Sequence, residues 1–156
     1  MIRVLFICLG NICRSPMAEA IFRDLVKKGK LEDHIRVGSA GIGHWHRGSV
    51  PHKGTRKILD DHHISYEGMV ARQVEEPDWD RFDYIIAMDG TNIQDLKAIR
   101  EKRDVVIGKL LDLAGNTEEV DVPDPYFTGN FHYVYELVNE GCSGLLTQIK
   151  QDHQLS

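Results

Sequence analysis

Short apolar runs alternate along this chain with longer stretches in which apolar residues recur at helical spacing. The short runs are rich in Val and Ile and are bounded by turn residues, a pattern typical of buried strands. They cover residues 3–8, 35–40, 84–87 and 105–110. The longer stretches, which we interpret as helices, cover residues 16–28, 51–62, 91–101 and 131–151.

The last of these helices has the clearest pattern. Its apolar side chains recur at spacings of three and four residues, which places them on one face that packs against a core. They are Phe131, Val134, Tyr135, Val138, Cys142, Leu145, Leu146 and Ile149. Strands that alternate with helices predict an α/β fold, here a three-layer sandwich with a central four-stranded parallel sheet and helices on both faces. Ligands of such folds bind at the carboxyl ends of the strands.

The first predicted strand runs directly into a loop that carries a reactive residue type. Cys8 ends the strand, Arg14 follows six positions later, and a helix begins directly afterwards. A short loop before a helix points successive backbone N–H groups inward, where they and the positive helix end attract an anion. That helix end and the Arg14 cation favour the nucleophilic thiolate form of Cys8. The sequence therefore predicts a phosphate-binding loop with a nucleophile at its base.

Other residues of this loop suit the same task. Gly10 lets the backbone approach a ligand closely, and Asn11 tolerates positive φ better than most residue types. We expect Ser15 to cap the helix and to offer its hydroxyl to the Cys8 sulfur, with Pro16 at the first helical position. Besides Arg14, whose planar guanidinium suits two phosphoryl oxygens, the residues expected to bind phosphate are Leu9, Gly10, Asn11, Ile12, Cys13 and Ser15.

A Cys and an Arg at this spacing occur by chance in many chains, so the loop alone is weak evidence. Four further stretches follow it, and with them the chain resembles the low molecular weight protein tyrosine phosphatase family, bacterial type, over nearly its full length. These stretches are Gly38-Ser39-Ala40-Gly41, Val70-Ala71-Arg72-Gln73, Ala87-Met88-Asp89 and Asp124-Pro125-Tyr126-Phe127. One position departs, because animal-type members carry a His where Met69 stands. If that His supports the phosphate-binding loop in those members, the support is missing here or comes from another residue.

The resemblance implies the catalytic roles. Cys8 is the nucleophile that forms a phosphocysteine intermediate, Arg14 binds the phosphoryl group, and Asp124 is the general acid. The chemistry agrees, because the leaving phenolate has a parent acid with a pKa of about 10, so a positioned acid helps at neutral pH. Asp124 lies between two prolines that stiffen its loop. Asp121 is the competing candidate, but it lacks the following proline and the aromatic pair.

Aromatic residues supply the expected walls of the site. Trp45 and Tyr126 are expected to sandwich a phenyl ring through face or edge contacts. A deep cradle with such walls admits the long phosphotyrosine side chain and holds the shorter phosphoserine out of reach. We expect Phe127 to serve packing rather than substrate contact.

The resemblance also implies two supports for the loop. Ser39 is expected to donate or accept a hydrogen bond with Asn11, and Asp89 to act from the end of the third strand. Either residue can instead be a simple cap or turn residue, since both types bond readily to nearby backbone.

Three histidines, His44, His46 and His52, invite interpretation as a metal site. They have no neighbouring Cys or acidic residue at regular ligand spacing. Arg14 and the backbone donors already neutralise a phosphate. We therefore expect surface or loop histidines, and neither a metal nor another cofactor.

Composition and charge limit the number of domains, the classes of partner and the compartment. A length of 156 residues suits one domain, residues 1–156. A net charge of −5 disfavours nucleic acid and anionic membranes as partners, and no apolar run is long enough for a membrane span or a signal-peptide core. Three cysteines cannot all pair, which favours a reducing compartment. We expect a cytoplasmic enzyme with phosphotyrosine proteins as substrates and inorganic phosphate as a product.

Three other interpretations stay open. Arsenate reductases share this fold and loop, but residues 14–141 contain no Cys to serve as their resolving thiol. Protein arginine phosphatases resemble one another in having Thr at the position of Ile12, where an apolar side chain favours an aromatic ring over a guanidinium. The third is a phosphoprotein-binding module without turnover, against which the combination of nucleophile, Arg and acid argues.

The cysteines also suggest redox sensitivity. Cys13 lies on the same loop as Cys8, so we expect it to capture oxidised Cys8 as a disulfide and make the inhibition reversible. Cys142 lies on the core face of the last predicted helix and is expected to be inert.

Overall fold

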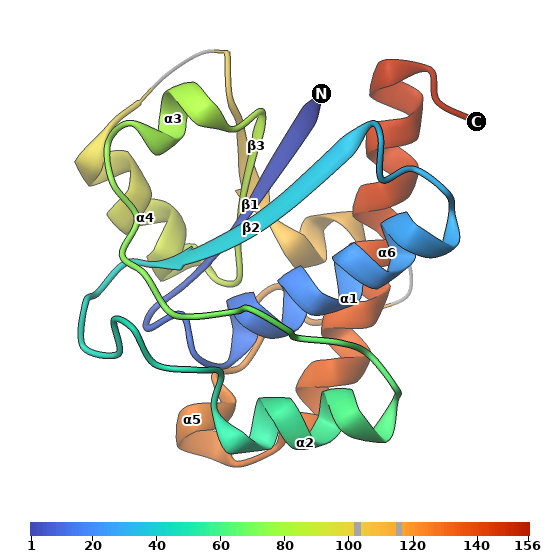
Figure 1. Cartoon of the computed structure of the whole chain (residues 1–156). Helices are drawn as coiled ribbons and strands as arrows, with labels where there is room; N and C mark the ends of the chain where they lie inside the picture. Colours follow the sequence, from blue (N-terminus) through green and yellow to red (C-terminus); the bar gives the residue numbers. More distant parts are fainter. Residues whose placement is uncertain (102–103, 115–116) are drawn as a thin grey trace.

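A computed structural model describes residues 1–101, 104–114 and 117–156. At its centre lies a parallel sheet with the strand order β2-β1-β3-β4 (Figure 1). The strands are β1 (Ile2–Cys8), β2 (Ile35–Gly41), β3 (Tyr84–Ala87) and β4 (Val106–Lys109). All four predicted strands are therefore present. The prediction was wrong at Leu110, which begins the short 3₁₀ helix η1 (Leu110–Leu113) instead of ending a strand.

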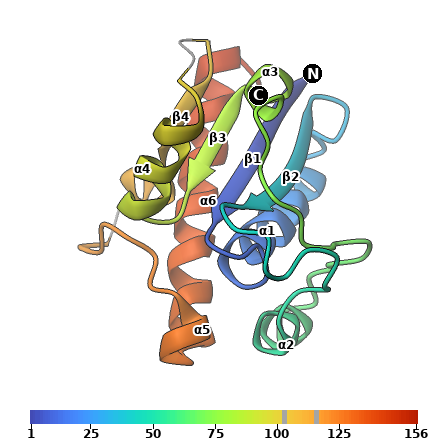
Figure 2. The ribbon, with the colours of Figure 1, turned by 90° about the vertical axis from the view of Figure 1, so that its left-hand side faces the viewer.

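Helices cover both faces of this sheet (Figure 2). They are α1 (Arg14–Lys28), α2 (Lys53–Asp61), α3 (Asp78–Arg81), α4 (Gly90–Ile99), α5 (Pro125–Thr128) and α6 (Phe131–His153). The four predicted helices correspond to α1, α2, α4 and α6, with ends shifted by up to two residues. The sequence did not predict α3, α5 or η1. The α/β sandwich with helices on both faces is confirmed.

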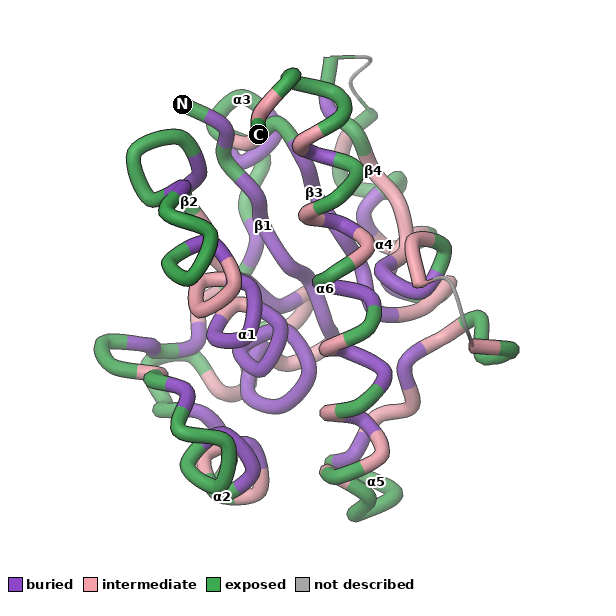
Figure 3. Tube along the Cα trace, turned by 90° about the vertical axis from the view of Figure 1, so that its right-hand side faces the viewer, coloured by how far each residue is buried: buried purple, intermediate pink, exposed green. Residues whose placement is uncertain are grey.

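Alternation along β1 explains why the sheet has two buried faces. Val4 and Phe6 belong to the core shared with α1 and α6, where the Phe6 ring meets the edge of Phe22 at a centroid distance of 5.6 Å. Leu5 and Ile7 belong to the other core, shared with α3 and α4. A strand buried on both sides reads as a continuous apolar run, as β1 does. Figure 3 shows β1 and β3 buried along almost their whole length.

Side-chain caps mark the start of α4 and α6. Asp89 caps α4 by accepting a hydrogen bond from the Asn92 N–H at 2.8 Å, and Asn130 caps α6 by accepting one from the Tyr133 N–H at 3.2 Å. Such caps satisfy N–H groups that have no partner inside the helix. Strands β1 and β3 are parallel neighbours in the sheet, so the joints that follow them lie next to each other at the same edge.

Across the described ranges, none of the helices combines the length and the apolar content that crossing a bilayer demands.

Candidate active site

The loop between β1 and α1 closes around the sulfur of Cys8. The Asn11 N–H donates a hydrogen bond to Cys8 Sγ at 3.3 Å, and the Ser15 hydroxyl lies 3.0 Å from the same atom. Asn11 adopts a φ of 58°, the left-handed conformation that its residue type suggested. Cys8 is only 3% exposed, yet it lines a surface cavity. The sulfur is thus held at the base of a loop that opens to solvent.

Asn11 ties this loop to the neighbouring segments. Its Nδ2 donates to Ser15 Oγ at 2.7 Å and to Ser39 Oγ at 2.9 Å, and its Oδ1 accepts from the Arg72 N–H at 3.0 Å. The hydrogen bond expected between Ser39 and Asn11 is present. With every polar atom of the Asn11 side chain engaged, the left-handed turn has one stable arrangement.

The network continues to Glu19, which sequence reasoning missed. The Ser39 hydroxyl donates to Glu19 Oε1 at 2.6 Å. Burial raises the pKa of Glu19, an effect that this hydrogen bond and the nearby Arg23 only partly oppose. No motif in the sequence marks Glu19, because its role depends on the packing of α1 against β2.

The expected helix cap at Ser15 was wrong. Helix α1 begins at Arg14, its N-cap is Cys13, and no side chain caps it. Pro16 is accordingly the third helical residue rather than the first, which is tolerated because first-turn N–H groups have no partner within the helix. The Ser15 hydroxyl faces Cys8 and Asn11 instead, as the network above shows.

Arg14 is buried between the loop and two carboxylates. Its Nη1 donates to Asp89 Oδ2 at 2.6 Å and to the Val122 carbonyl at 3.0 Å, while its Nη2 lies 3.3 Å from Asp124 Oδ2. Burial alone lowers the pKa of Arg14, but the Cys8 sulfur and both carboxylates raise it overall. Among the described residues, its Nε is buried without a hydrogen-bond partner. The guanidinium keeps a donor available beside Cys8.

The two carboxylates are fixed by capping. Asp89 binds Arg14 with one oxygen and the first turn of α4 with the other. Asp124 does the same at α5, where its Oδ1 accepts from the Tyr126 N–H at 3.1 Å. Asp124 also lines the cavity above Cys8. A carboxyl group held beside both the sulfur and the guanidinium is placed for proton transfer to a bound ligand.

Asp121, the competing candidate, faces elsewhere. Its Oδ1 accepts from the Gly90 N–H at 3.1 Å and from Lys109 Nζ at 3.2 Å. These contacts attach the Asp124 loop to the ends of β3 and β4, helped by the hydrogen bond from the Val122 N–H to the Met88 carbonyl at 2.8 Å. Asp121 therefore supports the loop and is absent from the cavity lining.

Aromatic side chains surround the mouth of this cavity, whose volume is about 260 Å³. Trp45 is 64% exposed and Tyr126 is 51% exposed, so both line the mouth and still have free faces. The expectation that Phe127 serves packing was wrong: it is 74% exposed and lines the same cavity. The full lining is Cys8, Leu9, Gly10, Ile12, Cys13, Trp45, His46, Asp124, Tyr126 and Phe127.

His46 is a wall residue that the sequence did not indicate. Its ring lies 5.8 Å from that of Tyr126, and a Cβ at Gly10 would come within 3.0 Å of its Cδ2. A side chain at position 10 would therefore push the His46 ring aside. His52 packs between Tyr126 and Phe131, with centroid distances of 5.9 Å and 5.1 Å. Both histidines are packing partners of the aromatic wall.

The other two cysteines differ in their surroundings. Cys13 lines the cavity, but burial, followed by the nearby Cys8, raises the pKa of its thiol to about 12. Cys142 lies on the core face of α6, where burial raises its pKa further. Cys13 and Cys142 are therefore thiols at neutral pH.

Comparisons with known proteins agree on one family. The family model described as "Low molecular weight phosphotyrosine protein phosphatase" matches residues 3–155. The chain is 56% identical to the low molecular weight protein-tyrosine-phosphatase YfkJ of Bacillus subtilis, over 99% of this chain and 100% of that protein. It is 50% identical to PtpA of Staphylococcus epidermidis, over 99% of this chain and 98% of the relative.

Solved structures give the same result. The crystal structure of YfkJ from Bacillus subtilis superposes with a TM-score of 0.95, covering 97% of this chain and 96% of that one. The crystal structure of DARP, a drosophila arginine phosphatase, superposes with a TM-score of 0.86 at 35% identity, covering 94% of this chain and 97% of that one.

Proposed function

Because the chain belongs to the low molecular weight protein tyrosine phosphatase family, we propose that it hydrolyses phosphotyrosine in proteins through a phosphocysteine intermediate on Cys8. The chain is a phosphatase, and the proposal concerns its substrate and mechanism. The observation that carries it is that Cys8 and Asp124 line one cavity, while the buried guanidinium of Arg14 contacts Asp124 beside it.

Binding of the phosphoryl group uses the loop and Arg14. The backbone N–H groups of the loop and the N-terminus of α1 supply donors and positive potential to the oxygens. Arg14 adds a fixed cation that interacts more strongly as charge spreads over the equatorial oxygens. These groups supply the charge neutralisation that other phosphatases obtain from a metal, so the proposed mechanism uses no metal ion and no cofactor.

In the first step, the Cys8 thiolate attacks phosphorus. The S–P bond forms as the bond from phosphorus to the tyrosyl oxygen breaks, and Asp124 gives its proton to that leaving oxygen. In the second step, the Asp124 carboxylate takes a proton from water, whose oxygen attacks phosphorus. The P–S bond breaks, inorganic phosphate leaves, and the thiolate and the protonated acid are restored.

Preference for phosphotyrosine is supported by the walls. Trp45, His46 and Tyr126 present ring faces and edges at the mouth, which suits a phenyl ring. Ile12 is buried and contributes apolar surface to the lining of the same cavity. The DARP relative named above is an arginine phosphatase, so phosphoarginine is the second substrate to test. The Ile12 side chain offers a guanidinium no polar partner, which argues against phosphoarginine.

The cysteines and the core support our proposals on the compartment and the number of domains. Cys8, Cys13 and Cys142 are all free thiols, which supports a reducing compartment, and we infer the cytoplasm. Cys142 lies inside the core, where it cannot relay a disulfide outward as arsenate reduction requires. Helices α1 and α6 pack on the same sheet face, so we infer one domain over residues 1–156.

Replacing the nucleophile tests this proposal. Cys8→Ser should abolish turnover of para-nitrophenyl phosphate, because a hydroxyl is a poor nucleophile at neutral pH without an adjacent base. Binding of phosphate or vanadate should partly survive, since the N–H donors and Arg14 are unchanged. Isothermal titration with vanadate measures the second property. Residual turnover above about a few per cent of the wild-type rate would contradict the assignment of Cys8.

A further inference from the structure

Two segments of opposite charge border the mouth of the cavity. Residues 41–57, here called the basic rim, contain no Asp or Glu. Their basic and titratable residues are His44, His46, Arg47, His52, Lys53, Arg56 and Lys57. Residues 117–128, here called the acidic rim, contain no Lys or Arg. Their carboxylates are Glu118, Glu119, Asp121 and Asp124.

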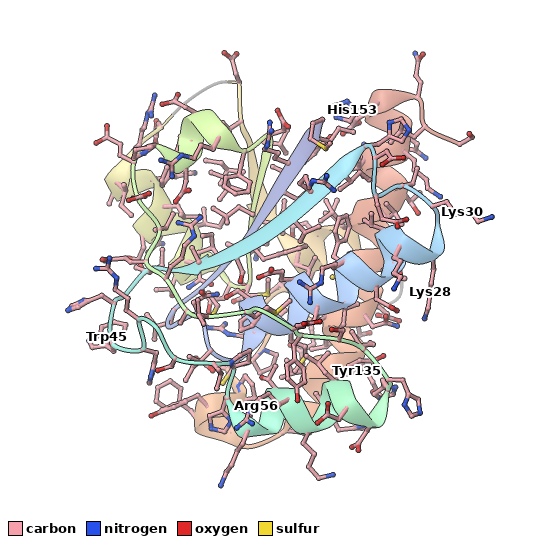
Figure 4. The ribbon with its side chains drawn as sticks, in the orientation of Figure 1. Lys28, Lys30, Trp45, Arg56, Tyr135 and His153 are labelled. Atoms are coloured by element: carbon pink, nitrogen blue, oxygen red, sulfur yellow. The ribbon has the colours of Figure 1, made fainter. Side chains whose placement is uncertain are left out.

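The two rims face each other across the cavity. The basic rim contributes Trp45 and His46 to the lining, and the acidic rim contributes Asp124, Tyr126 and Phe127. Ring contacts join the rims at Tyr126, as described above. Figure 4 shows Trp45 and Arg56 on the side of the molecule that carries α5, whereas Lys30 projects from the opposite side. A substrate that places its phosphotyrosine in the cavity therefore has one rim on either side of it.

The cations of the basic rim are available to a ligand. Among the residues that the structure describes, no carboxylate lies within ion-pair distance of Arg47, Lys53 or Arg56. Arg47 and Lys53 are exposed, while Arg56 uses its Nε to bind the Pro51 carbonyl at 2.9 Å. Lys57 differs, because its Nζ pairs with Asp61 Oδ2 at 3.4 Å.

The carboxylates of the acidic rim are more fully engaged. Asp121 pairs with Lys109 and Asp124 with Arg14, while Glu119 accepts a hydrogen bond from the Tyr133 hydroxyl at 2.8 Å. Glu118 is exposed. The rim still presents negative charge, with no cation of its own to offset it. An acidic substrate segment is attracted to one rim and repelled by the other.

We propose that the basic rim binds an acidic segment next to the phosphotyrosine of the substrate, and so fixes the direction in which the substrate chain crosses the cavity. This inference rests on the proposed function. The whole chain carries a net charge of −5, so overall charge repels acidic partners. Recognition of an acidic segment therefore depends on local cations: Arg47, which directly follows the lining residue His46, and Lys53, which begins α2.

Two mirror-image phosphopeptides test the direction. Both carry a central phosphotyrosine; one has Glu residues before it and Lys residues after it, and the other has the reverse order. Composition and net charge are identical, so attraction to the whole protein cancels. We expect kcat/KM to differ by about threefold or more between the two peptides, as a few exposed ion pairs produce. The difference should shrink as salt is added.

Charge reversal assigns the preference to the rim. In the double variant Arg47→Glu, Lys53→Glu, the preferred peptide should lose its advantage or the preference should reverse. The matched control is Lys30→Glu, which removes an exposed cation on the far side and should leave the ratio of the two kcat/KM values unchanged.

The outcomes separate the two proposals. Equal kcat/KM for the two peptides, or a ratio that the double variant leaves intact, overturns the directional inference while the phosphatase proposal stands. The directional inference is also overturned if Lys30→Glu changes the ratio as much as the double variant does. If neither phosphotyrosine peptide is hydrolysed, the proposed function fails and the inference fails with it.

Discussion

Asp124 is the residue whose role can be tested most sharply by a single replacement. Asp124→Ala should lower kcat on phosphotyrosine by about 10²–10⁴-fold, the usual effect of losing a general acid. The loss in the first step should be much smaller for an activated aryl phosphate, whose leaving group needs no proton. Steady-state and pre-steady-state rates on both substrates measure this difference.

Asp121→Ala is the matched control for that experiment. Asp121 lies on the same loop but binds Lys109 and the Gly90 N–H instead of facing the cavity. Its removal should loosen the loop and cost less activity, with no dependence on the leaving group. The acid assignment would be wrong if the Asp124 variant showed equal first-step losses on both substrates.

Ile12 tests the choice between phosphotyrosine and phosphoarginine. Ile12→Thr removes apolar contact with a phenyl ring and supplies a hydroxyl for a polar guanidinium. The ratio of kcat/KM for phosphotyrosine to that for phosphoarginine should fall. An unchanged ratio would remove Ile12 from the specificity argument and strengthen the case for arginine phosphatase activity.

At the scale of single residues, the site residues that could be predicted from the sequence are those that lie on contiguous motifs. Cys8, Asn11 and Arg14 lie close together along the chain, so the sequence alone indicates that they act together. Glu19 and His46 escaped prediction because each acts on the loop from another segment, through Ser39 and through contact with Gly10. Such contacts exist only after β2 and the segment beyond it have packed against the loop.

At the scale of elements, the loop between β1 and α1 holds two thiols on one cavity. Peroxide converts the Cys8 thiolate to a sulfenic acid, and attack by the Cys13 thiolate then forms a disulfide and releases the oxygen as water. The pKa of Cys13 is raised to about 12. As long as the pH stays below that value, the thiolate fraction of Cys13 rises about tenfold with each unit by which the pH increases. Capture should accordingly be slow at neutral pH and faster in alkali.

The measurement is the activity that dithiothreitol restores after peroxide, relative to each protein's own starting activity. Wild type should recover more than Cys13→Ser, and the gap should widen from about pH 7 to about pH 9. Equal recovery of the two proteins at both pH values, or a disulfide that links Cys8 to Cys142, would remove Cys13 as the resolving thiol.

Long elements were predictable and very short ones were not. The four longer helices show periodic apolar positions, but α3, α5 and η1 span only four residues each, too few for a period to appear. The backbone of η1 runs close against α6, where a Cβ at Gly144 would collide with the Leu113 carbonyl. Leu110 also packs against α6, where a Cβ at Gly141 would collide with its side chain, and the sequence pattern of residues 105–110 does not show such contacts with a distant segment.

At the scale of the whole molecule, parallel topology assembles the site. Cys8 ends β1 and Asp89 follows β3, and these strands are neighbours in the sheet, so both residues lie at the same edge. Arg14 then reaches Asp89 and Asp124 across sequence separations of 75 and 110 residues. The alternating pattern predicted the fold class and the edge that binds ligands. It left open the strand order and the way α5 brings Asp124 to Arg14, because both depend on tertiary packing.

The central claim is that Cys8 carries the phosphoryl group between two half-reactions. The most direct test mixes Asp124→Ala with excess para-nitrophenyl phosphate, since this activated leaving group departs without the acid while hydrolysis of the intermediate still needs the base. We predict a burst of one phenolate per enzyme, followed by slow turnover, and a phosphoryl group on the peptide that contains Cys8 when the quenched protein is mapped by mass spectrometry. No burst, or a phosphoryl group on another residue, would contradict the account.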